Sequence, residues 1–410
     1  MNEAYIVDAI RTPIGSFRGA LAQVRADDLA AIPIKALLEK YPDLPKDVID
    51  DVILGCHNQA GEDNRNVARM ALLLAGLPYT VPGETVNRLC SSGMSTVVQA
   101  NRAIKAGDGD VFIAGGMEHM SRGPLVISKS SIAFGNDSKM EDSSFGWRFV
   151  NKKLHEMYGT DAMGITAENL AELFNISRED QDLFAYNSQM KATKAQQKGI
   201  LSEEICNVEI PQRKGDPIIV SQDEFIRPST TLEKLATLRT VFKKDGTVTA
   251  GNASGLNDGA AAMLVVSEDA LKKYNLTPKA RIVASAVVGV EPKIMGIGPV
   301  EATKKALQKA GLQLSDMDVM EFNEAFSAQA LACTRQLGLE DNDPRINPNG
   351  GAIALGHPLG MSGTRIIHAA MNQLVRSNGR FALATMCVGV GMGYATIIEN
   401  MEQLSQLKRK

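Results

Sequence analysis

A cysteine lies between an apolar approach and a run of small residues in the stretch Val86-Asn87-Arg88-Leu89-Cys90-Ser91-Ser92-Gly93-Met94. The residues that follow, 95–105, are compatible with a helix. A helix N-terminus presents unpaired N–H groups and the positive end of a dipole, which stabilise a thiolate, the nucleophilic form of cysteine. Cys90 is therefore a candidate nucleophile. The alternative is an apolar cysteine packed beneath the helix, because free cysteine is often buried.

Length and charge limit the classes of function open to the chain. At 410 residues it is too long for one simple core, and two or three structural units are expected. The hydrophobic share of 44% and the charged share of 22% are ordinary for a soluble globular protein. The net charge of −3 gives no reason to expect a nucleic-acid partner or a membrane surface.

The cysteines are odd in number and scattered, at positions 56, 90, 206, 333 and 387. Their spacing matches neither a zinc site nor a disulfide framework, so neither a metal nor a disulfide is expected. Reduced thiols are typical of a cytoplasmic protein. The first residues do not resemble a signal peptide, and no apolar run approaches the length of a membrane span.

The first part of the chain alternates strand-like and helix-like segments. Strands are expected at residues 4–9, 49–54, 110–114, 247–252 and 260–267, and helices at 27–40, 66–75, 166–174 and 178–199. This alternation predicts an α/β fold with a mostly parallel sheet covered by helices on both faces. Residues 121–246 are more irregular and are predicted to be a loop domain inserted in the first half, which comprises residues 1–120 and about 247–272.

The second half, residues 273–410, repeats the opening pattern weakly. The matched pairs are the strands 50–54 and 318–322, the loops 87–93 and 349–363 with the helices that follow them, and the strands 111–114 and 381–386. Two similar βαβ halves set back to back would bring the loops of the matched strands to one shared face. Segments distant in the sequence are therefore expected to meet there.

Three loops of the second half carry residues capable of catalysis. They are Asn323-Glu-Ala-Phe326, the loop 349–363 with His357 and five glycines, and Cys387-Val-Gly-Val-Gly-Met-Gly393. Taken singly, His357 is compatible with a structural histidine, Cys387 with a buried thiol and Asn323 with a turn. Taken together with Cys90, a nucleophile, a base and a second thiol favour acyl transfer through a thioester. Backbone N–H donors in the glycine-rich loops would stabilise the oxyanions.

These motifs resemble those of the thiolases. The matching segments are Asn87-Arg-Leu-Cys-Ser-Ser-Gly93, Gly251-Asn-Ala-Ser-Gly-Leu-Asn-Asp-Gly-Ala260, Asn323-Glu-Ala-Phe326, Asn349-Gly-Gly-Ala-Ile-Ala-Leu-Gly-His-Pro358 and Cys387-Val-Gly-Val-Gly-Met-Gly393. The resemblance extends from about residue 3 to residue 400. It implies a five-layered αβαβα fold of two similar halves with an inserted loop domain. It also implies a homotetramer built as a dimer of dimers.

The resemblance assigns a role to each residue of the catalytic set. Cys90 would carry the acyl group, and His357 would deprotonate it and bind one oxyanion with a water held by Asn323. Cys387 would remove or return a proton at the second substrate. The N–H groups of Cys90 and Gly389 would form the other oxyanion hole. The reaction implied is the reversible cleavage of a 3-oxoacyl-CoA by CoA to acetyl-CoA and a shortened acyl-CoA, with no permanently bound cofactor.

By the same resemblance, coenzyme A would lie along the inserted domain. The residues expected near it are Arg227, Phe242, Ala250, Ser254, Leu256 and Phe326, with Met163 and Met295 toward the acyl end. Three positions depart from the family pattern. They are Ser91, where glycine is usual, Ala162, where many acetoacetyl-CoA thiolases carry histidine, and Lys234, where serine is frequent.

The segment Phe145-Gly-Trp-Arg-Phe-Val-Asn151 resembles the branch of the family that cleaves 3-oxoadipyl-CoA in aromatic catabolism. Arg148 or a nearby lysine is a candidate partner for the distal carboxylate of that substrate. The alternative is that Arg148 is a surface or tetramer-contact residue. For function the alternatives are an acetoacetyl-CoA thiolase, a ketoacyl synthase and a cysteine hydrolase. A ketoacyl synthase is expected to carry a second histidine where Asn323 stands, and neither it nor the hydrolase needs Cys387.

Overall fold

The structure is a computed structural model that describes residues 2–402, and a mixed sheet of ten strands forms its centre. The strands of the first half are β1 (Ala4–Arg11), β2 (Gly15–Ser16), β3 (Asp51–Gly55), β4 (Gly83–Val86), β5 (Val111–His119) and β10 (Asn257–Ser267). Those of the second half are β11 (Ala280–Gly289), β12 (Val319–Phe322), β13 (Phe381–Val388) and β14 (Met392–Asn400).

The strand order confirms the predicted duplication. The sheet runs β12-β13-β14-β11-β1-β10-β5-β3-β4, so the order β1-β10-β5-β3 of the first half recurs as β11-β14-β13-β12. The halves join where β1 and β11 pair antiparallel, with Tyr5 opposite Arg281 and Ile6 opposite Ala280. The loops after β3 and β12 therefore occupy equivalent places, as do the loops after β5 and β13.

The prediction of a mostly parallel sheet is wrong. Only β3–β4, β3–β5 and β12–β13 are parallel, and the other paired strands of the sheet run antiparallel. The reason is that β10 returns between β1 and β5, and β14 between β11 and β13. Both strands are almost wholly buried, so their sequences are as continuously apolar as those of parallel strands.

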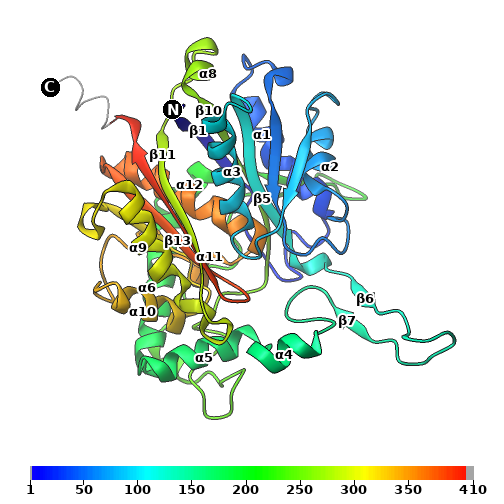
Figure 1. Ribbon diagram of the computed structural model, residues 1–410, viewed down its shortest axis with the longest axis vertical. Helices are drawn as coiled ribbons and strands as arrows, with labels where there is room; N and C mark the ends of the chain where they lie inside the picture. Colours follow the sequence, from blue (N-terminus) through cyan, green and yellow to red (C-terminus); the bar gives the residue numbers. More distant parts are fainter. Residues whose placement is uncertain (1, 403–410) are drawn as a thin grey trace.

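Helices cover both faces of each half of the sheet, so the layers follow one another as helix, sheet, helix, sheet and helix (Figure 1). Their bounds are α1 (Ala26–Lys40), α2 (Val67–Leu74), α3 (Ser92–Ala106), α8 (Glu268–Lys273), α9 (Gly298–Ala310), α10 (Ser327–Gln336), α11 (Ala352–Leu355) and α12 (Leu359–Ser377). The outer layers are α1 with α2 and α9 with α10. The middle layer is α3 with α12, whose apolar side chains pack against the strands of both halves.

The middle helices cross with their backbones in contact. A methyl group on Gly93 of α3 would lie 2.6 Å from the carbonyl oxygen of Gly360, and one on Gly363 of α12 would overlap the backbone nitrogen of Met94. The hydroxyl of Thr364 also donates to the carbonyl of Gly93, at 3.1 Å. Because α3 begins just after Cys90 and α12 just after His357, this crossing fixes the distance between the two loops.

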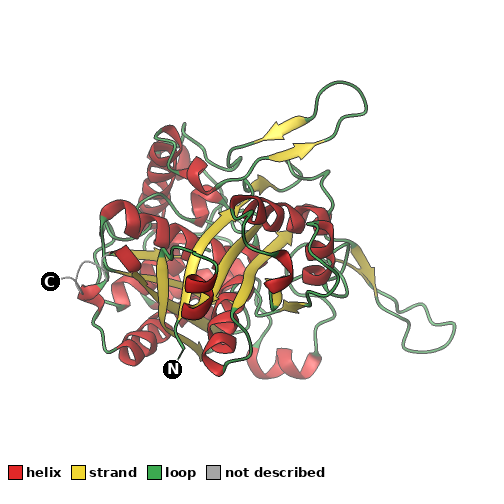
Figure 2. Ribbon diagram, turned by 90° about the horizontal axis from the view of Figure 1, so that it is seen from above, coloured by secondary structure: helices red, strands yellow, loops and turns green. Residues whose placement is uncertain are grey.

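The segment between β5 and β10 contributes helices and two hairpins, β6–β7 and β8–β9, that project from the body (Figure 2). Its elements are β6 (Leu125–Ile127), β7 (Met140–Asp142), α4 (Lys152–Tyr158), α5 (Met163–Leu173), α6 (Arg178–Gln197), β8 (Val208–Ile210), β9 (Ile218–Val220) and α7 (Leu232–Ala236). Short 3-10 turns lie at Lys46–Val48, Met120–Arg122, Leu201–Glu204, Pro292–Ile297 and Leu314–Asp316. Although it leaves from the first half, this segment packs through α5 and α6 on α10 and α11 of the second.

The predicted strand at residues 247–252 is also wrong. The carboxylate of Glu168 accepts the N–H groups of Thr247 and Val248, and the side-chain oxygen of Asn252 accepts that of Thr249. Side chains thus take the backbone donors that a neighbouring strand would otherwise use. Within residues 2–402, no helix is both long enough and apolar enough to cross a membrane.

We expect Gly363→Ala to lower the free energy of unfolding by about 1–3 kcal/mol, because the added methyl has no space beside Met94. Alanine is otherwise favoured over glycine inside a helix by roughly 0.5–1 kcal/mol. A loss of stability in Gly363→Ala would therefore report the clash of the added methyl with Met94. The measurement is the thermal midpoint at a fixed protein concentration. Gly289→Ala in β11 is the control, since its methyl would meet nothing closer than 3.9 Å. Equal midpoints for the two variants would contradict the role of the crossing.

Candidate active site

A cavity of about 360 Å³ opens beside Cys90. Its walls come from the loops after β3 and β13, the loop before α3, the start of α12 and the inserted segment. The lining residues are His57, Asn58, Asn87, Leu89, Cys90, Phe145, Gly146, Trp147, Arg148, Met163, Leu359, Gly389 and Val390. The matched loops of the two halves thus meet at one face, as the repeat predicted.

Cys90 lies at the bend that leads into α3, two residues before its first turn. Its side chain is half-buried, and its sulfur accepts from the N–H of Gly389. Burial nevertheless raises the pKa of the Cys90 thiol to about 11, more than the Gly389 N–H lowers it. The helix N-terminus therefore does not by itself keep Cys90 ionised, because desolvation of the charged sulfur outweighs the N–H donors. The nucleophile needs a proton acceptor.

Cys387 lies at the end of β13, two residues before Gly389, and is fully buried. Burial raises the pKa of its thiol well above the ordinary value, and a charge on Cys90 raises that pKa further. The two sulfurs are thus close enough to interact, although 297 positions separate them in the chain (387 − 90). The turn that carries Gly389 is tight, with Val390 and Gly391 both at positive φ, 62° and 85°.

His357 is buried at the end of the glycine-rich loop, and its imidazole is bonded on both sides. Nδ1 lies 2.6 Å from the hydroxyl of Ser362, which itself donates to the carbonyl of Pro358. Because the Ser362 hydrogen is used in that bond, Nδ1 carries the ring proton and Nε2 is the acceptor nitrogen of the ring. Nε2 faces the side-chain nitrogen of Asn323, at 3.3 Å.

The surroundings of His357 keep it neutral. Burial lowers the pKa of His357 to about 3, and the charge of Arg365 acts in the same direction. A neutral imidazole with its lone pair on Nε2 can accept a proton from a thiol. Cys90 and His357 each resist carrying a charge alone, whereas a thiolate and an imidazolium would stabilise each other.

Asn323 follows β12 and is fully buried. Its side-chain nitrogen points at His357, and its side-chain oxygen has no hydrogen-bond partner among the described residues. A buried unpaired oxygen is costly unless a water or ligand satisfies it. This matches the place where the resemblance expects a held water, and the water itself stays a prediction.

The residues predicted for coenzyme A fall into two adjoining groups. Arg227 and Ala250 line a groove of about 210 Å³ together with Ser229 and Lys234. Phe242 stacks edge-on against Phe326, with ring centroids 6.2 Å apart. Met163, Met295 and Phe326 belong to the same buried cluster as Cys387, whereas Leu256 lies just before β10 and in neither group. The N–H of Ser254 donates to the carbonyl of Ala325, so that loop lies against the loop of Asn323.

The three departures from the family pattern have ordinary local roles. The hydroxyl of Ser91 is turned inward and donates to the carbonyl of Arg88 at 3.1 Å. Ala162 is the N-cap residue of α5, and its side chain makes no capping hydrogen bond. Lys234 lies on α7, where its ammonium donates to the carbonyl of Ser229 at 2.9 Å and borders the groove of Arg227.

Sequence reasoning missed the residues that hold the site in place. Ser362 fixes the tautomer of His357, and Asn257 accepts the backbone N–H of His357 at 2.9 Å. Glu118, on β5, accepts N–H groups from His57, Asn58 and Gly360, and so ties the loop after β3 to the loop of His357. Ser362 and Asn257 had a visible signal, since Ser362 lies inside the glycine-rich loop and Asn257 inside a motif that matches the family, whereas Glu118 had none.

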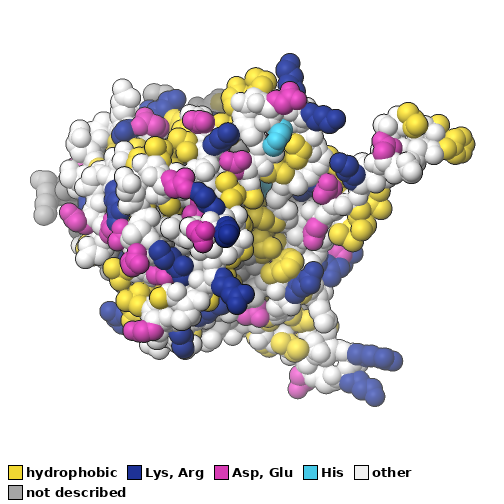
Figure 3. All heavy atoms as spheres, turned by 90° about the horizontal axis from the view of Figure 1, so that it is seen from below, with side chains coloured by type: hydrophobic (Ala, Val, Ile, Leu, Met, Phe, Trp, Pro, Cys, Tyr) yellow, Lys and Arg dark blue, Asp and Glu magenta, His cyan; other side chains and the backbone are white. Residues whose placement is uncertain are grey.

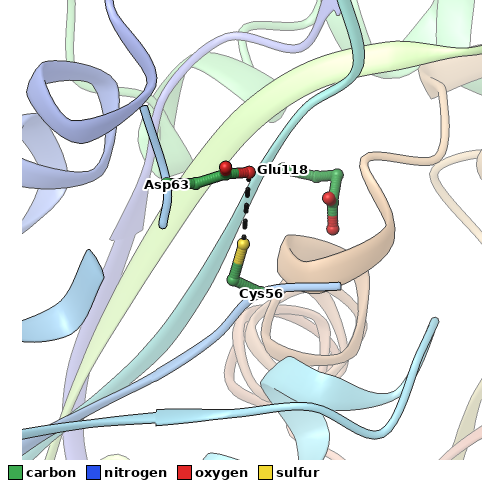
Figure 4. A group of neighbouring side chains, drawn as sticks. All are labelled: Cys56, Asp63 and Glu118. Atoms are coloured by element: carbon green, nitrogen blue, oxygen red, sulfur yellow. Dashed lines mark hydrogen bonds between the residues drawn. The ribbon is translucent and has the colours of Figure 1, made fainter. Parts of the chain in front are cut away.

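Glu118 lies near Cys56 and Asp63, and one ligand atom from each residue falls within 4.8 Å of the others (Figure 4). The Cys56 thiol donates to Asp63 at 3.6 Å, and burial keeps its pKa well above the ordinary value. Burial also raises the pKa of Glu118 to about 7, although three N–H donors oppose that rise. The Cys56 thiol is protonated, and the carboxylate of Glu118 already accepts three backbone N–H groups. We therefore interpret the cluster as a structural support for the loops.

Comparisons with known proteins agree with this geometry. The chain matches the family models "Thiolase, N-terminal domain" over residues 4–269 and "Thiolase, C-terminal domain" over residues 276–400. It is 60% identical to a beta-ketoadipyl-CoA thiolase of Acinetobacter baylyi, over 98% of this chain and 100% of that protein. It is 59% identical to the 3-oxoadipyl-CoA/3-oxo-5,6-dehydrosuberyl-CoA thiolase of Escherichia coli, with the same coverage.

Solved structures give the same result. The acetyl-CoA acetyltransferase of Bacillus anthracis superimposes with a TM-score of 0.91 at 40% identity, over 98% of this chain and 99% of that one. Human mitochondrial 3-ketoacyl-CoA thiolase in complex with CoA superimposes with a TM-score of 0.90 at 42% identity, over 98% of each chain. The two family models together span nearly the whole chain, and the predicted thiolase fold is confirmed. The chain belongs to the thiolase family.

Proposed function

We propose that the protein cleaves 3-oxoadipyl-CoA with coenzyme A, giving acetyl-CoA and the acyl-CoA shortened by two carbons. The observation that carries the proposal is one cavity in which the sulfur of Cys90 receives the N–H of Gly389 while Arg148 lines the wall. The relatives named beta-ketoadipyl-CoA thiolase support the same substrate. Acetoacetyl-CoA is the alternative substrate.

The reaction begins at the pair of Cys90 and His357. The thiol gives its proton to Nε2 of His357, and the sulfur attacks C3 of the substrate. The oxyanion that forms is held by N–H groups of the glycine-rich loops, and loss of one such donor typically costs about 10²–10³ in rate. We assign these oxyanion sites to the N–H groups of Cys90 and Gly389, and to His357 with a water on Asn323.

Cys387 supplies the next proton. When the C2–C3 bond breaks, its electron pair stays on C2 of the departing acetyl-CoA, which takes a proton from the Cys387 thiol. The acyl group remains on Cys90 as a thioester. An incoming CoA thiol restores the proton of Cys387 and attacks the thioester. Cys90 then leaves as a thiolate and recovers its proton from His357.

We propose that coenzyme A lies along the groove of Arg227 and Ala250 and past Phe242 toward Phe326. The groove supports this proposal because Lys234 and Arg227 offer cations for the phosphates of the nucleotide. Met163 lines the cavity and packs against the cluster of Phe326, so the pantetheine arm would pass beside Met163 on its way to Cys90.

We further propose a cytoplasmic homotetramer. All five cysteines are free thiols, in keeping with a reducing compartment. The hairpin β6–β7 carries exposed apolar side chains at Leu125, Ile127, Ile132, Phe134 and Met140, and its tip is visible as a yellow projection in Figure 3. An exposed apolar patch of this kind marks a surface that another subunit covers.

Replacing Cys387 separates thiolysis from acylation. We expect Cys387→Ala to lower kcat for 3-oxoacyl-CoA cleavage by about 10²–10⁴-fold, because the departing carbanion loses its acid. Cys90 should still take up an acetyl group from acetyl-CoA, seen as added mass on the intact protein. Cys206→Ala is the matched control, since Cys206 is half-buried outside the cavity. If Cys387→Ala keeps most of its turnover, a hydrolase-like reaction is favoured over a thiolase reaction.

The substrate is tested with a panel of three thioesters. We expect a higher specificity constant, kcat/KM, with 3-oxoadipyl-CoA than with acetoacetyl-CoA or uncharged 3-oxohexanoyl-CoA, because the cavity presents an unpaired guanidinium to the acyl chain. The measurement is CoA-dependent loss of the 3-oxoacyl-CoA. A faster turnover of both uncharged thioesters would reject the dicarboxylic substrate while leaving thiolase activity in place.

The hairpin is tested by a charge at its tip. We expect Phe134→Glu to shift the assembly from tetramers to dimers in size-exclusion chromatography with light scattering, since a buried carboxylate in an apolar contact is costly. The control is Lys214→Glu between β8 and β9, another exposed hairpin tip. Tetramers that persist in Phe134→Glu, or that are lost equally in both variants, would speak against this contact.

A further inference from the structure

We propose that His57 and Arg148 together recognise the distal carboxylate of a dicarboxylic acyl chain bound to Cys90, with His57 serving as a neutral N–H donor. The inference rests on the proposed function, because it concerns the same cavity. Both residues line that cavity with Cys90, although they come from different parts of the chain, the loop after β3 and the segment before α4. Trp147 and Leu359 supply apolar wall for the methylene groups between them.

The backbone of His57 is held on both sides. Its N–H donates to Glu118 at 3.0 Å, and its carbonyl accepts the side-chain nitrogen of Asn87, also at 3.0 Å. Its imidazole, in contrast, makes no hydrogen bond to any described residue and is only half-buried. A fixed backbone with an unused ring N–H in a cavity wall is a preorganised donor for a ligand.

Arg148 is anchored but not neutralised. One terminal nitrogen donates to the side-chain oxygen of Asn58 at 3.2 Å, and the other to the carbonyl of Ser143 at 3.3 Å. Both partners are neutral, and within residues 2–402 no carboxylate pairs with this guanidinium. A guanidinium has five N–H donors, so the remaining ones are available for a carboxylate. An unpaired cation in a partly apolar cavity is most stable when an anion enters.

The charges around His57 decide its protonation state. Burial and the charge of Arg148 together lower the pKa of His57 to about 4, with Asp63 acting in the opposite direction. Asp63 is itself occupied by the N–H of Gly61 and the thiol of Cys56, and His357 on the far side is neutral. A nearby carboxylate typically raises a histidine pKa by about 1–3, so a bound carboxylate brings the pKa of His57 to pH 7 at most, and the ring is neutral above that pH. Arg148 supplies the charge and His57 the hydrogen bond.

The test measures KM with two thioesters, the dicarboxylic 3-oxoadipyl-CoA and the uncharged 3-oxohexanoyl-CoA, in His57→Leu, His57→Gln and Arg148→Gln. We expect His57→Leu and Arg148→Gln to raise the ratio of the first KM to the second by about 10- to 100-fold, the usual effect of losing a hydrogen bond to a charged group. His57→Gln should recover most of the loss, because its amide also offers an N–H. In the unaltered protein the ratio should stay constant between about pH 8 and pH 9, where the imidazole of His57 is neutral even beside a bound carboxylate.

Three results would overturn the inference. An unchanged KM ratio in His57→Leu would show that the imidazole does not meet the carboxylate. An equal rise of both KM values in His57→Leu would indicate a packing role. A KM ratio that rises steadily with pH would mean that His57 binds the carboxylate in its protonated form. Absence of thiolysis with both thioesters in the unaltered protein would instead reject the proposed function, so the two failures are distinguishable.

Discussion

The crossing of α3 and α12 is the constraint on which the site depends. Two glycines, Gly93 and Gly363, let the helix backbones touch, and the two helices begin directly after the loops of Cys90 and His357. The strand pairing between β1 and β11 that joins the two halves of the sheet is short, so the helix contact helps to set the loop of Cys90 against the loop of His357. Glu118 makes the connection rigid by bonding to the loops on both sides. The duplicated architecture thus turns residues far apart in the sequence into one cavity.

Burial then sets the chemistry. It raises the pKa of the Cys90 thiol to about 11, and lowers that of His357 to about 3. Neither group is charged at rest, and the N–H groups near Cys90 have no anion to hold until the substrate provides an oxyanion. Donors that are already in place when charge develops cost no reorganisation during the reaction. The cavity is in this sense built for the charged states along the reaction path.

Many residues of the candidate site could be proposed from the sequence, because they lie in short, recognisable motifs. Cys90, His357 and Cys387 each lie beside glycines, and the repeat indicated that their loops would meet. The direction of β10 could not be predicted, since a strand buried on both faces reads the same in either orientation. His57 and Glu118 were missed because their roles depend on partners 60 or more positions away. Residues 247–252 were read as a strand because the carboxylate of Glu168, which takes their donors, is also remote in sequence.

The protonated state of Cys90 has a consequence for its durability. Oxidants and alkylating agents react with the thiolate, and a thiol of pKa about 11 is ionised in only about one molecule in 10⁴ near pH 7. The resting sulfur is thereby shielded from peroxide by its own desolvation, in addition to the cover given by the walls of the cavity.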